Sequence, residues 1–288
     1  MRHGSLRLRL VPALLLLFLG VLPAIPASAK TIPGQLAGDA RNLLERLPSE
    51  GASMIAAPFR HANARADLLA AAGLGAAFAA DPDVRRTLQP HLSAGDRDRA
   101  HTWSAWIEPR HEMGVAIGLY GAGLLSGVDP VRETGLRGGE ALLLTEGMTI
   151  LLKRATGRER PFRDRGSASF HPFGGSTSLP SGHASSAFAL ATVVSRMSGR
   201  PLVSAAAYGV AGSVAAARVI QDVHWTSDVA AGAMVGILAG RVATADRRSA
   251  SADAEPPDEA ARGEKDSGAS LHFRPSVAPL GIAFDARF

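Results

Sequence analysis

Six apolar runs rich in Ala, Leu and Gly dominate the chain, and Gly, Pro or charged residues separate each run from the next. They lack the alternation of β-branched residues that strands show, so we interpret all six as helices. The runs are Leu68–Ala80, Met113–Val128, Ala141–Leu152, Ala184–Val194, Leu202–Ala217 and Val229–Gly240. Because strand signals are almost absent before residue 271, the pattern predicts an all-α fold, a helical bundle.

Proline and its neighbours predict where several helices end. A short amphipathic helix is expected over Ala40–Leu47, with Asp39 as its N-cap and Pro48 ending it. Asp81-Pro82-Asp83 and Asp129-Pro130 predict further breaks, because proline has no N–H to donate and restricts the residue before it.

The longest apolar runs are short for a bilayer. Sixteen residues of helix span about 24 Å, whereas a hydrocarbon core needs about 20 apolar residues. The glycines in and beside Ala116–Leu125 make this run the best candidate for a close helix-packing face, in a soluble core or a membrane bundle alike. We expect a compact bundle in or against the membrane.

Residues 1–29 have the pattern of a secretory signal peptide. Leu10–Leu22 is its apolar region, Ala27-Ser28-Ala29 its cleavage site, and its basic residues are Arg2, Arg7 and Arg9. An uncleaved anchor helix is the alternative, but Pro23 and Pro26 favour cleavage. The leader predicts export, and the Ala- and Arg-rich composition suggests a bacterial periplasm or envelope.

Composition excludes several classes of function. The chain has no cysteine, which excludes disulfides, thiolate metal sites and a cysteine nucleophile. Three of its five net positive charges lie in the leader, so the mature chain carries about +2 and nucleic-acid binding is not expected.

The end of the chain differs in composition from the predicted helical domain, residues 30–243. Residues 244–270 contain no large apolar side chain and predict a disordered linker. Apolar residues return in 271–288, where Ile282, Phe284, Ala286 and Phe288 alternate with small or polar residues like one short strand. This segment is expected to pair with a short neighbour or to cap the bundle.

A basic segment follows the third apolar run. Lys153 is expected in the last turn of that helix, Gly157 just beyond its end, and Arg160 in an extended conformation imposed by Pro161. An ammonium and a guanidinium at one helix exit suit phosphate oxygens. By itself, such a segment is more often a solvated helix terminus.

Pro180-Ser181-Gly182-His183 precede the fourth run. Ser181 is expected to cap the helix, and Gly182 to let an anion approach the N–H groups of its first turn. His183 would point a titratable group at the same anion. The alternative is an ordinary capped helix start with an incidental histidine.

The third segment runs from Arg218 to Asp228. Thr226 or Ser227 is expected to cap the last apolar helix, which leaves His224 just outside it and Asp228 in its first turn. Asp228 could then accept a hydrogen bond from one ring nitrogen of His224 and support the charge that develops when the other nitrogen attacks. The alternative is an acid that merely balances the helix dipole.

Together the segments form the series K-x6-R-P, P-S-G-H and R-x5-H-x3-D, in this order. The series resembles the signature of the type 2 phosphatidic acid phosphatase superfamily, which is shared with vanadium-dependent haloperoxidases. The resemblance implies the helical bundle of that superfamily. One position departs from it, because Ala217 stands where the family usually has Ser. A hydroxyl contact to the phosphate pocket is lost but no proton-transfer group, so we expect tuning rather than inactivation.

The resemblance also implies roles for the motif residues. His224 would attack phosphorus to give a phosphohistidine, with Asp228 orienting it, and His183 would protonate the leaving alcohol and then activate water. The phosphate would be bound by Lys153, Arg160, Ser181, Gly182 and Arg218. These groups would stabilise the transferring phosphoryl group without a metal or other cofactor. These roles require His224 to be neutral while His183 is protonated, so the activity would have a bell-shaped dependence on pH.

The function implied is an exported, metal-independent, acid-type phosphatase acting on a phosphomonoester or pyrophosphate. Phosphorylated lipids such as phosphatidic acid, phosphatidylglycerol phosphate or a polyprenyl pyrophosphate are favoured, with a membrane surface as partner; a small soluble phosphate ester stays open. One alternative is a haloperoxidase, for which vanadate would be the cofactor rather than an inhibitor. Another is a non-catalytic envelope protein that binds lipid phosphate. The loop Phe162–Leu179 is a lid or a solvated connector.

Overall fold

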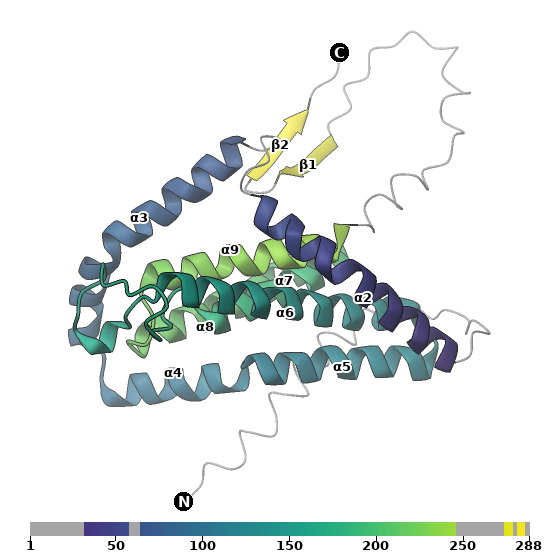
Figure 1. The fold of residues 1–288 in the computed structure, drawn as a ribbon, viewed down its shortest axis with the longest axis horizontal. Coiled ribbons are helices and arrows are strands. Elements are labelled where there is room, and N and C mark those ends of the chain that lie inside the picture. The colour runs from purple at the N-terminus through teal and green to yellow at the C-terminus, as the bar shows by residue number, and fades with distance from the viewer. Residues whose placement is uncertain (1–31, 58–63, 246–273, 279–280, 286–288) are drawn as a thin grey trace, which may run out of the picture.

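The computed structural model describes residues 32–57, 64–245, 274–278 and 281–285 (Figure 1). Within these ranges the protein is helical apart from two short strands. The helices are α2 (Ile32–Ala56), α3 (Ala64–Leu88), α4 (Ala94–Trp106), α5 (Pro109–Ser126), α6 (Asp129–Thr156), α7 (Gly182–Ser198), α8 (Pro201–Ile220) and α9 (Thr226–Ala243), with single 3-10 turns η3 (Gln89–His91) and η4 (Pro161–Arg163). The prediction of an all-α bundle is confirmed.

Two predicted segments fall wholly or mostly outside these ranges. The signal peptide, 1–29, and nearly all of the linker, 244–270, lie outside the described residues. Within 271–288, β1 (Arg274–Ala278) pairs antiparallel with β2 (Gly281–Asp285), so the predicted strand corresponds to β2 and its expected short neighbour to β1.

Helix α7 is the centre of the bundle. It packs against α6, α8 and α9, while α5 lies on α6, α4 on α8 and α3 against α9 (Figure 1). Most of its residues between Ala184 and Val194 are buried, and the core clusters around it consist mainly of Ala and Val. Small side chains let the helices approach closely.

Close contact between α7 and α9 sets the geometry of one end of the bundle. A Cβ on Gly236 would lie 2.1 Å from the carbonyl oxygen of Ser185, and one on Gly232 would lie 2.7 Å from that of Ser181. No side chain fits at such distances, so these glycines let the two backbones meet. The first turns of α7 and α9 are thereby side by side, and the Ser181 N–H donates to the Asp228 carbonyl oxygen over 2.9 Å.

The run Ala116–Leu125 of α5 does pack closely on α6, as predicted, but most of its glycines lie away from the contact. Gly114, Gly118 and Gly121 have open space where a Cβ would be, whereas a Cβ on Gly123 would lie 2.2 Å from the Arg132 backbone nitrogen of α6. Glycine spacing alone could not show which face of the helix meets a neighbour.

Two predicted helix ends are also wrong. Helix α2 continues through Pro48, and Asp39 lies inside it, where it pairs with Arg132 of α6 instead of capping a helix. Helix α3 continues through Pro82 to Leu88. Each proline removes one hydrogen bond within its helix, and both helices continue past it in contact with α9. The break at Asp129 is confirmed, because α6 begins there.

Helix α4 was not predicted, because it is too polar to show an apolar stripe. Its signal is the capping box at its start: the Ser93 hydroxyl accepts from the Asp96 N–H, and the Asp96 carboxylate accepts from the Ser93 N–H.

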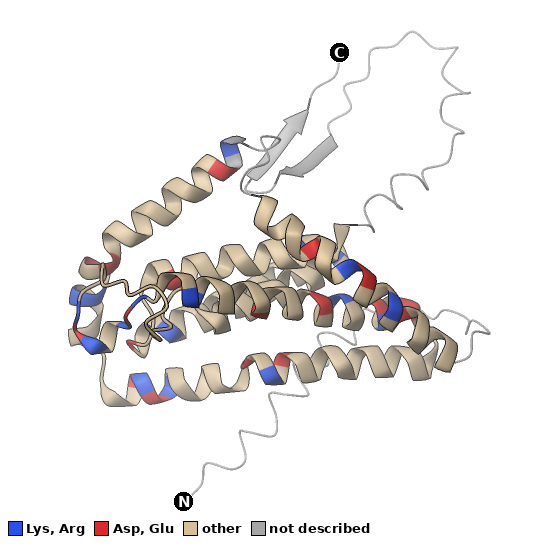
Figure 2. Ribbon diagram, in the orientation of Figure 1, with Lys and Arg blue, Asp and Glu red and all other residues tan. Residues whose placement is uncertain are grey.

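Apolar side chains are exposed on the outside of the bundle. Leu202 of α8 is 82% exposed and Leu125 of α5 is 81% exposed. Among the helices described, α8 alone is long and apolar enough to cross a membrane, a property that core helices of soluble proteins can share. Figure 2 shows charged residues around the loop that follows α6 and along α2, whereas the middles of α8 and α9 carry none.

Candidate active site

The three sequence motifs meet at the end of the bundle where α6 ends and α7 and α9 begin. Helix α6 ends at Gly157, whose φ of 54° is left-handed and whose N–H donates to the Lys153 carbonyl oxygen, as predicted. A Cβ on Gly157 would lie 1.7 Å from the His171 carbonyl oxygen, so glycine is required there. Lys153 itself reaches α7, since a Cβ on Gly182 would lie 3.6 Å from its Nζ.

Three partly exposed cations surround His183: Lys153, Arg160 and Arg218. Burial, followed by the charges of Arg218 and of the neighbouring His224, lowers the pKa of His183 to about 3. Burial and the charge of Arg160 lower the pKa of Lys153. Positive charges held this close together favour an anion among them.

Buried polar atoms without a partner lie on the elements that meet here. The Ser181 hydroxyl, Nε of Arg218 and the Thr149 hydroxyl make no hydrogen bond with any described residue. Ser181 occupies the N-cap position of α7, but its side chain does not cap the helix, contrary to the prediction. Buried polar groups are usually hydrogen-bonded, so these atoms are available to a bound ligand.

His224 is 3% exposed and directs Nδ1 toward Asp228. The Nδ1 to Oδ2 distance is 3.6 Å, longer than a hydrogen bond, and within the part of the chain that the structure describes Nδ1 has no other partner. Such catalytic contacts often tighten only when substrate binds. Burial lowers the pKa of His224 to about 4, although Asp228 acts in the opposite direction.

The N-cap of α9 is Trp225, so the predicted caps, Thr226 and Ser227, are wrong. Both residues are already helical. The Trp225 N–H donates to Asp228 Oδ2 over 2.9 Å, and the Ser178 hydroxyl donates to the same oxygen over 2.5 Å. Burial would raise the pKa of Asp228, but His224, Arg158 and Ser178 outweigh it and hold that pKa below its usual value.

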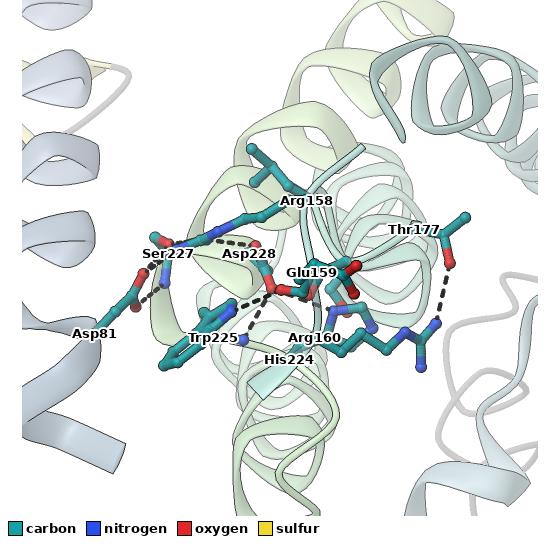
Figure 3. Close-up of polar contacts among 12 residues, drawn as sticks. Asp81, Arg158, Glu159, Arg160, Thr177, His224, Trp225, Ser227 and Asp228 are labelled. Atoms are coloured by element: carbon teal, nitrogen blue, oxygen red, sulfur yellow. Dashed lines mark hydrogen bonds and ion pairs between the residues drawn. The ribbon is translucent and has the colours of Figure 1, made fainter. Parts of the chain in front are cut away.

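Arg158 is a site residue that the sequence analysis missed. Its side chain is fully buried, and Nη1 donates to Asp228 Oδ1 over 2.7 Å (Figure 3). Nη2 donates to Asp81 Oδ2 over 2.8 Å, so one guanidinium bridges two buried carboxylates. Its position two residues before Arg160 in the first motif was the available signal.

Asp81 was also missed, because it was interpreted as part of a helix break. It is 1% exposed on α3, and its Oδ1 accepts the Ser227 N–H over 2.9 Å. The Ser227 hydroxyl donates to Oδ2. Asp81 therefore fixes the start of α9 to α3 (Figure 3).

Ser104 of α4 supplies a hydroxyl next to Arg218. The Ser104 oxygen accepts from Arg218 Nη1 over 3.3 Å and from Gln221 Nε2 over 3.0 Å. Ala217, which replaces the usual family Ser, is 3% exposed. A hydroxyl from another helix thus contacts the same arginine, and no sequence signal predicted it.

The loop Phe162–Leu179 is tied to the first motif by its backbone. Glu159 N–H donates to the Ser169 carbonyl oxygen over 3.0 Å, and Ser178 N–H donates to that of Arg158 over 3.1 Å. These bonds favour the fixed connector over the lid. Phe173, 84% exposed, lies in this loop.

A surface recess of about 880 Å³ lies beside Trp225, and neither His183 nor His224 lines it. Its arginines are each paired with a carboxylate: Arg85 with Asp164 and Asp222, Arg86 with Asp83, and Arg165 with Glu159. It therefore differs from the motif site, where the cations lack such partners. Within the described residues, no three His, Asp or Glu side chains are grouped to hold a metal ion.

Comparisons with known proteins agree with the motifs. Residues 135–250 match the family model of the PAP2 superfamily. A lipid A 1-phosphatase from Porphyromonas gingivalis is 39% identical over 103 residues, which cover 35% of this chain and 21% of that protein. The chain thus matches about a fifth of the length of this curated relative.

Two solved structures are similar at lower identity. The crystal structure of Aquifex aeolicus LpxE is 18% identical, with a TM-score of 0.43, and the match covers 57% of this chain and 94% of that one. A transmembrane PAP2-type phosphatidylglycerolphosphate phosphatase from Bacillus subtilis is 16% identical, with a TM-score of 0.45, 72% of this chain and 95% of that one being covered. All three motifs lie within residues 135–250, the segment that matches the family model of the PAP2 superfamily.

Proposed function

We propose that this protein is a phosphatase that removes a phosphate group from a lipid through a phosphohistidine at His224, without a metal ion. The observation that carries the proposal is the convergence of three cations with few partners on the first turn of α7, beside His183 and His224. The positive ends of backbone dipoles and these cations stabilise the charge on a transferring phosphoryl group.

In the first step, Nε2 of His224 attacks phosphorus while Nδ1 faces Asp228. The bond between phosphorus and the leaving oxygen breaks, and that oxygen takes a proton from His183. In the ligand-free site His183 is neutral near pH 7, since its pKa is about 3. A bound phosphate monoanion offsets the surrounding cations and brings the proton that His183 needs.

In the second step, His183 accepts a proton from water as the water oxygen attacks the phosphohistidine. The P–N bond breaks, inorganic phosphate forms and His224 is regenerated. Asp228 supports the positive charge on His224 in both steps, because its carboxylate faces the ring nitrogen that does not react.

The exposed apolar surface supports a lipid substrate. Leu125 and Leu202 project from different helices, and Phe162 and Phe173 are exposed on the loop beside the first motif. Exposed apolar area of this kind favours association with a membrane. The name of the Porphyromonas gingivalis relative makes a lipid A carrying a 1-phosphate one substrate to test.

The test is phosphate release by the full chain in detergent, with EDTA present. The substrates are phosphatidic acid, a lipid A carrying a 1-phosphate, a polyprenyl pyrophosphate and p-nitrophenyl phosphate. We expect release from at least one lipid, inhibition by vanadate, and loss of activity in His224→Ala. Release that requires added metal, or that persists in His224→Ala, would contradict the mechanism.

A labelling experiment tests the intermediate. Substrate carrying ³²P, followed by an alkaline quench that preserves phosphohistidine, should label the wild type but not His224→Ala. His183→Ala should accumulate label from a substrate with an activated leaving group, such as p-nitrophenyl phosphate. Formation of the phosphohistidine then needs little acid catalysis from His183, whereas its hydrolysis still needs His183 as a base.

A further inference from the structure

The contacts of Asp228 divide between its two carboxylate oxygens. Oδ2 accepts from the Trp225 N–H and the Ser178 hydroxyl and faces Nδ1 of His224. Oδ1 accepts from Arg158. The side of Asp228 opposite the nucleophile is therefore occupied by a buried cation outside the three phosphate-binding residues.

Arg158 is held in place from several directions. Nε and Nη2 donate to the Ser167 carbonyl oxygen over 2.9 and 2.6 Å. The guanidinium carbon lies 4.6 Å from the ring centre of Phe78 and 5.5 Å from that of Trp225. A guanidinium with such partners has no freedom to reach a phosphate.

Asp81 completes the arrangement from a helix outside the family match. It accepts from Arg158 and, through both oxygens, from Ser227, the residue before Asp228. An exposed fraction of 1% or less is found for each of the four side chains, Asp81, Arg158, Ser227 and Asp228. In such surroundings one cation between two carboxylates offsets their mutual repulsion.

We propose that Asp81 and Arg158 are positioning residues for the nucleophile: Asp81 holds the Arg158 guanidinium on Oδ1 of Asp228, which keeps Asp228 ionised and its Oδ2 directed at His224. This inference rests on the proposed function. Arg158 and His224 are the charged or titratable groups next to Asp228, and Asp81 lies on the far side of Arg158. Lys153 and Arg160 act on Asp228 from the side of the phosphate site.

Arg158→Gln tests the role of the charge. Arg158 is one of the groups that hold the pKa of Asp228 low, so that pKa should rise without it and less Asp228 should be ionised near neutral pH. We expect kcat to fall about 10- to 100-fold at pH 6 with KM nearly unchanged, and to recover as pH rises. The double variant Asp81→Asn/Arg158→Gln removes the repulsion between carboxylates and should lose this new pH dependence.

The matched control is Arg132→Gln, which breaks another interhelical Arg–Asp pair, between α6 and α2. Arg132 lies about 30 Å along α6 from Lys153. This variant should destabilise the fold without altering the pH profile. If Arg158→Gln does not fold, the double variant, which leaves one buried carboxylate without its cation instead of two, is compared with Asp81→Asn. A kcat within twofold of the wild type in both variants would overturn the proposal.

The ¹⁵N chemical shifts of the His224 ring give a readout that does not need activity. In the wild type the proton should reside on Nδ1, facing Asp228, and Arg158→Gln should shift it toward a mixture of tautomers. A shifted tautomer in a protein with no phosphatase activity would reject the proposed function but retain the positioning role. If the protein is an active phosphatase but neither the His224 tautomer nor kcat changes in the Arg158 and Asp81 variants, the positioning role alone would be rejected.

Discussion

Arg158 and Arg160 lie two residues apart in one motif, yet they occupy opposite kinds of environment. Arg158 is fully buried and donates to two carboxylates, a hydroxyl and a carbonyl oxygen. Arg160 is partly exposed, and its Nη2 lies 3.5 Å from the Thr177 hydroxyl. An arginine with satisfied donors stabilises the protein, whereas one with spare donors is available to an anion.

The largest expected difference between them is in stability. Arg158→Gln should lower the free energy of unfolding by about 3–5 kcal/mol, because it leaves Asp81 and Asp228 buried without their cation. Arg160→Gln should change it by less than about 1 kcal/mol. Urea unfolding in the same detergent measures both. Equal losses in the two variants would show that the environments do not differ as described.

The next difference is in catalysis. Arg160→Gln should lower kcat/KM by about 10²- to 10³-fold, since it removes one donor to the charge that develops on the phosphoryl group. Vanadate should also inhibit this variant more weakly than the wild type. Arg163→Gln is the matched control, because Arg163 is exposed on the same loop and its ion pair is with Glu159. A loss no larger than that of Arg163→Gln would remove Arg160 from the phosphate site.

The contrast between the two arginines also marks what the sequence could predict. Helices α5 to α9 and the meeting of three motifs follow from apolar runs and from residue types suited to phosphate. The pairing of Arg158 with Asp81 could not be recognised, since it joins residues 77 positions apart. Asp81 was misinterpreted because Pro82 indicates a break locally, whereas α3, which packs against α9, continues through that proline.

The pH dependence should separate the two arginines further. Burial lowers the pKa of His224 to about 4, Asp228 acts against it, and Arg160 and Arg218 lower it further. A protonated His224 cannot attack, so kcat/KM should fall as pH drops through about 4. Arg160→Gln removes a positive charge, which raises the pKa of His224 and moves this fall to higher pH. The profile is measured between pH 3 and 8 with a substrate whose own titration is known; an unmoved limb would contradict the assignment.

The smallest expected effect concerns the hydroxyl beside Arg218, a cation of the Arg160 kind. Ser104→Ala removes an acceptor shared by Arg218 and Gln221, each of which keeps another partner. Losing one such hydrogen bond costs about 1 kcal/mol, or roughly fivefold in kcat/KM. Ser213→Ala, which removes an exposed hydroxyl that contacts Trp103, is the control.

Ala217→Ser makes this last prediction sharper. It places a hydroxyl at the position that the family usually uses, next to Arg218 in the chain. If Ser104 stands in for that hydroxyl, Ala217→Ser should recover activity in the Ser104→Ala background and add little to the wild type. If the two hydroxyls share one role, Ala217→Ser should change activity only when the Ser104 hydroxyl is absent. An equal effect of Ala217→Ser with and without Ser104 would show that the two hydroxyls act independently.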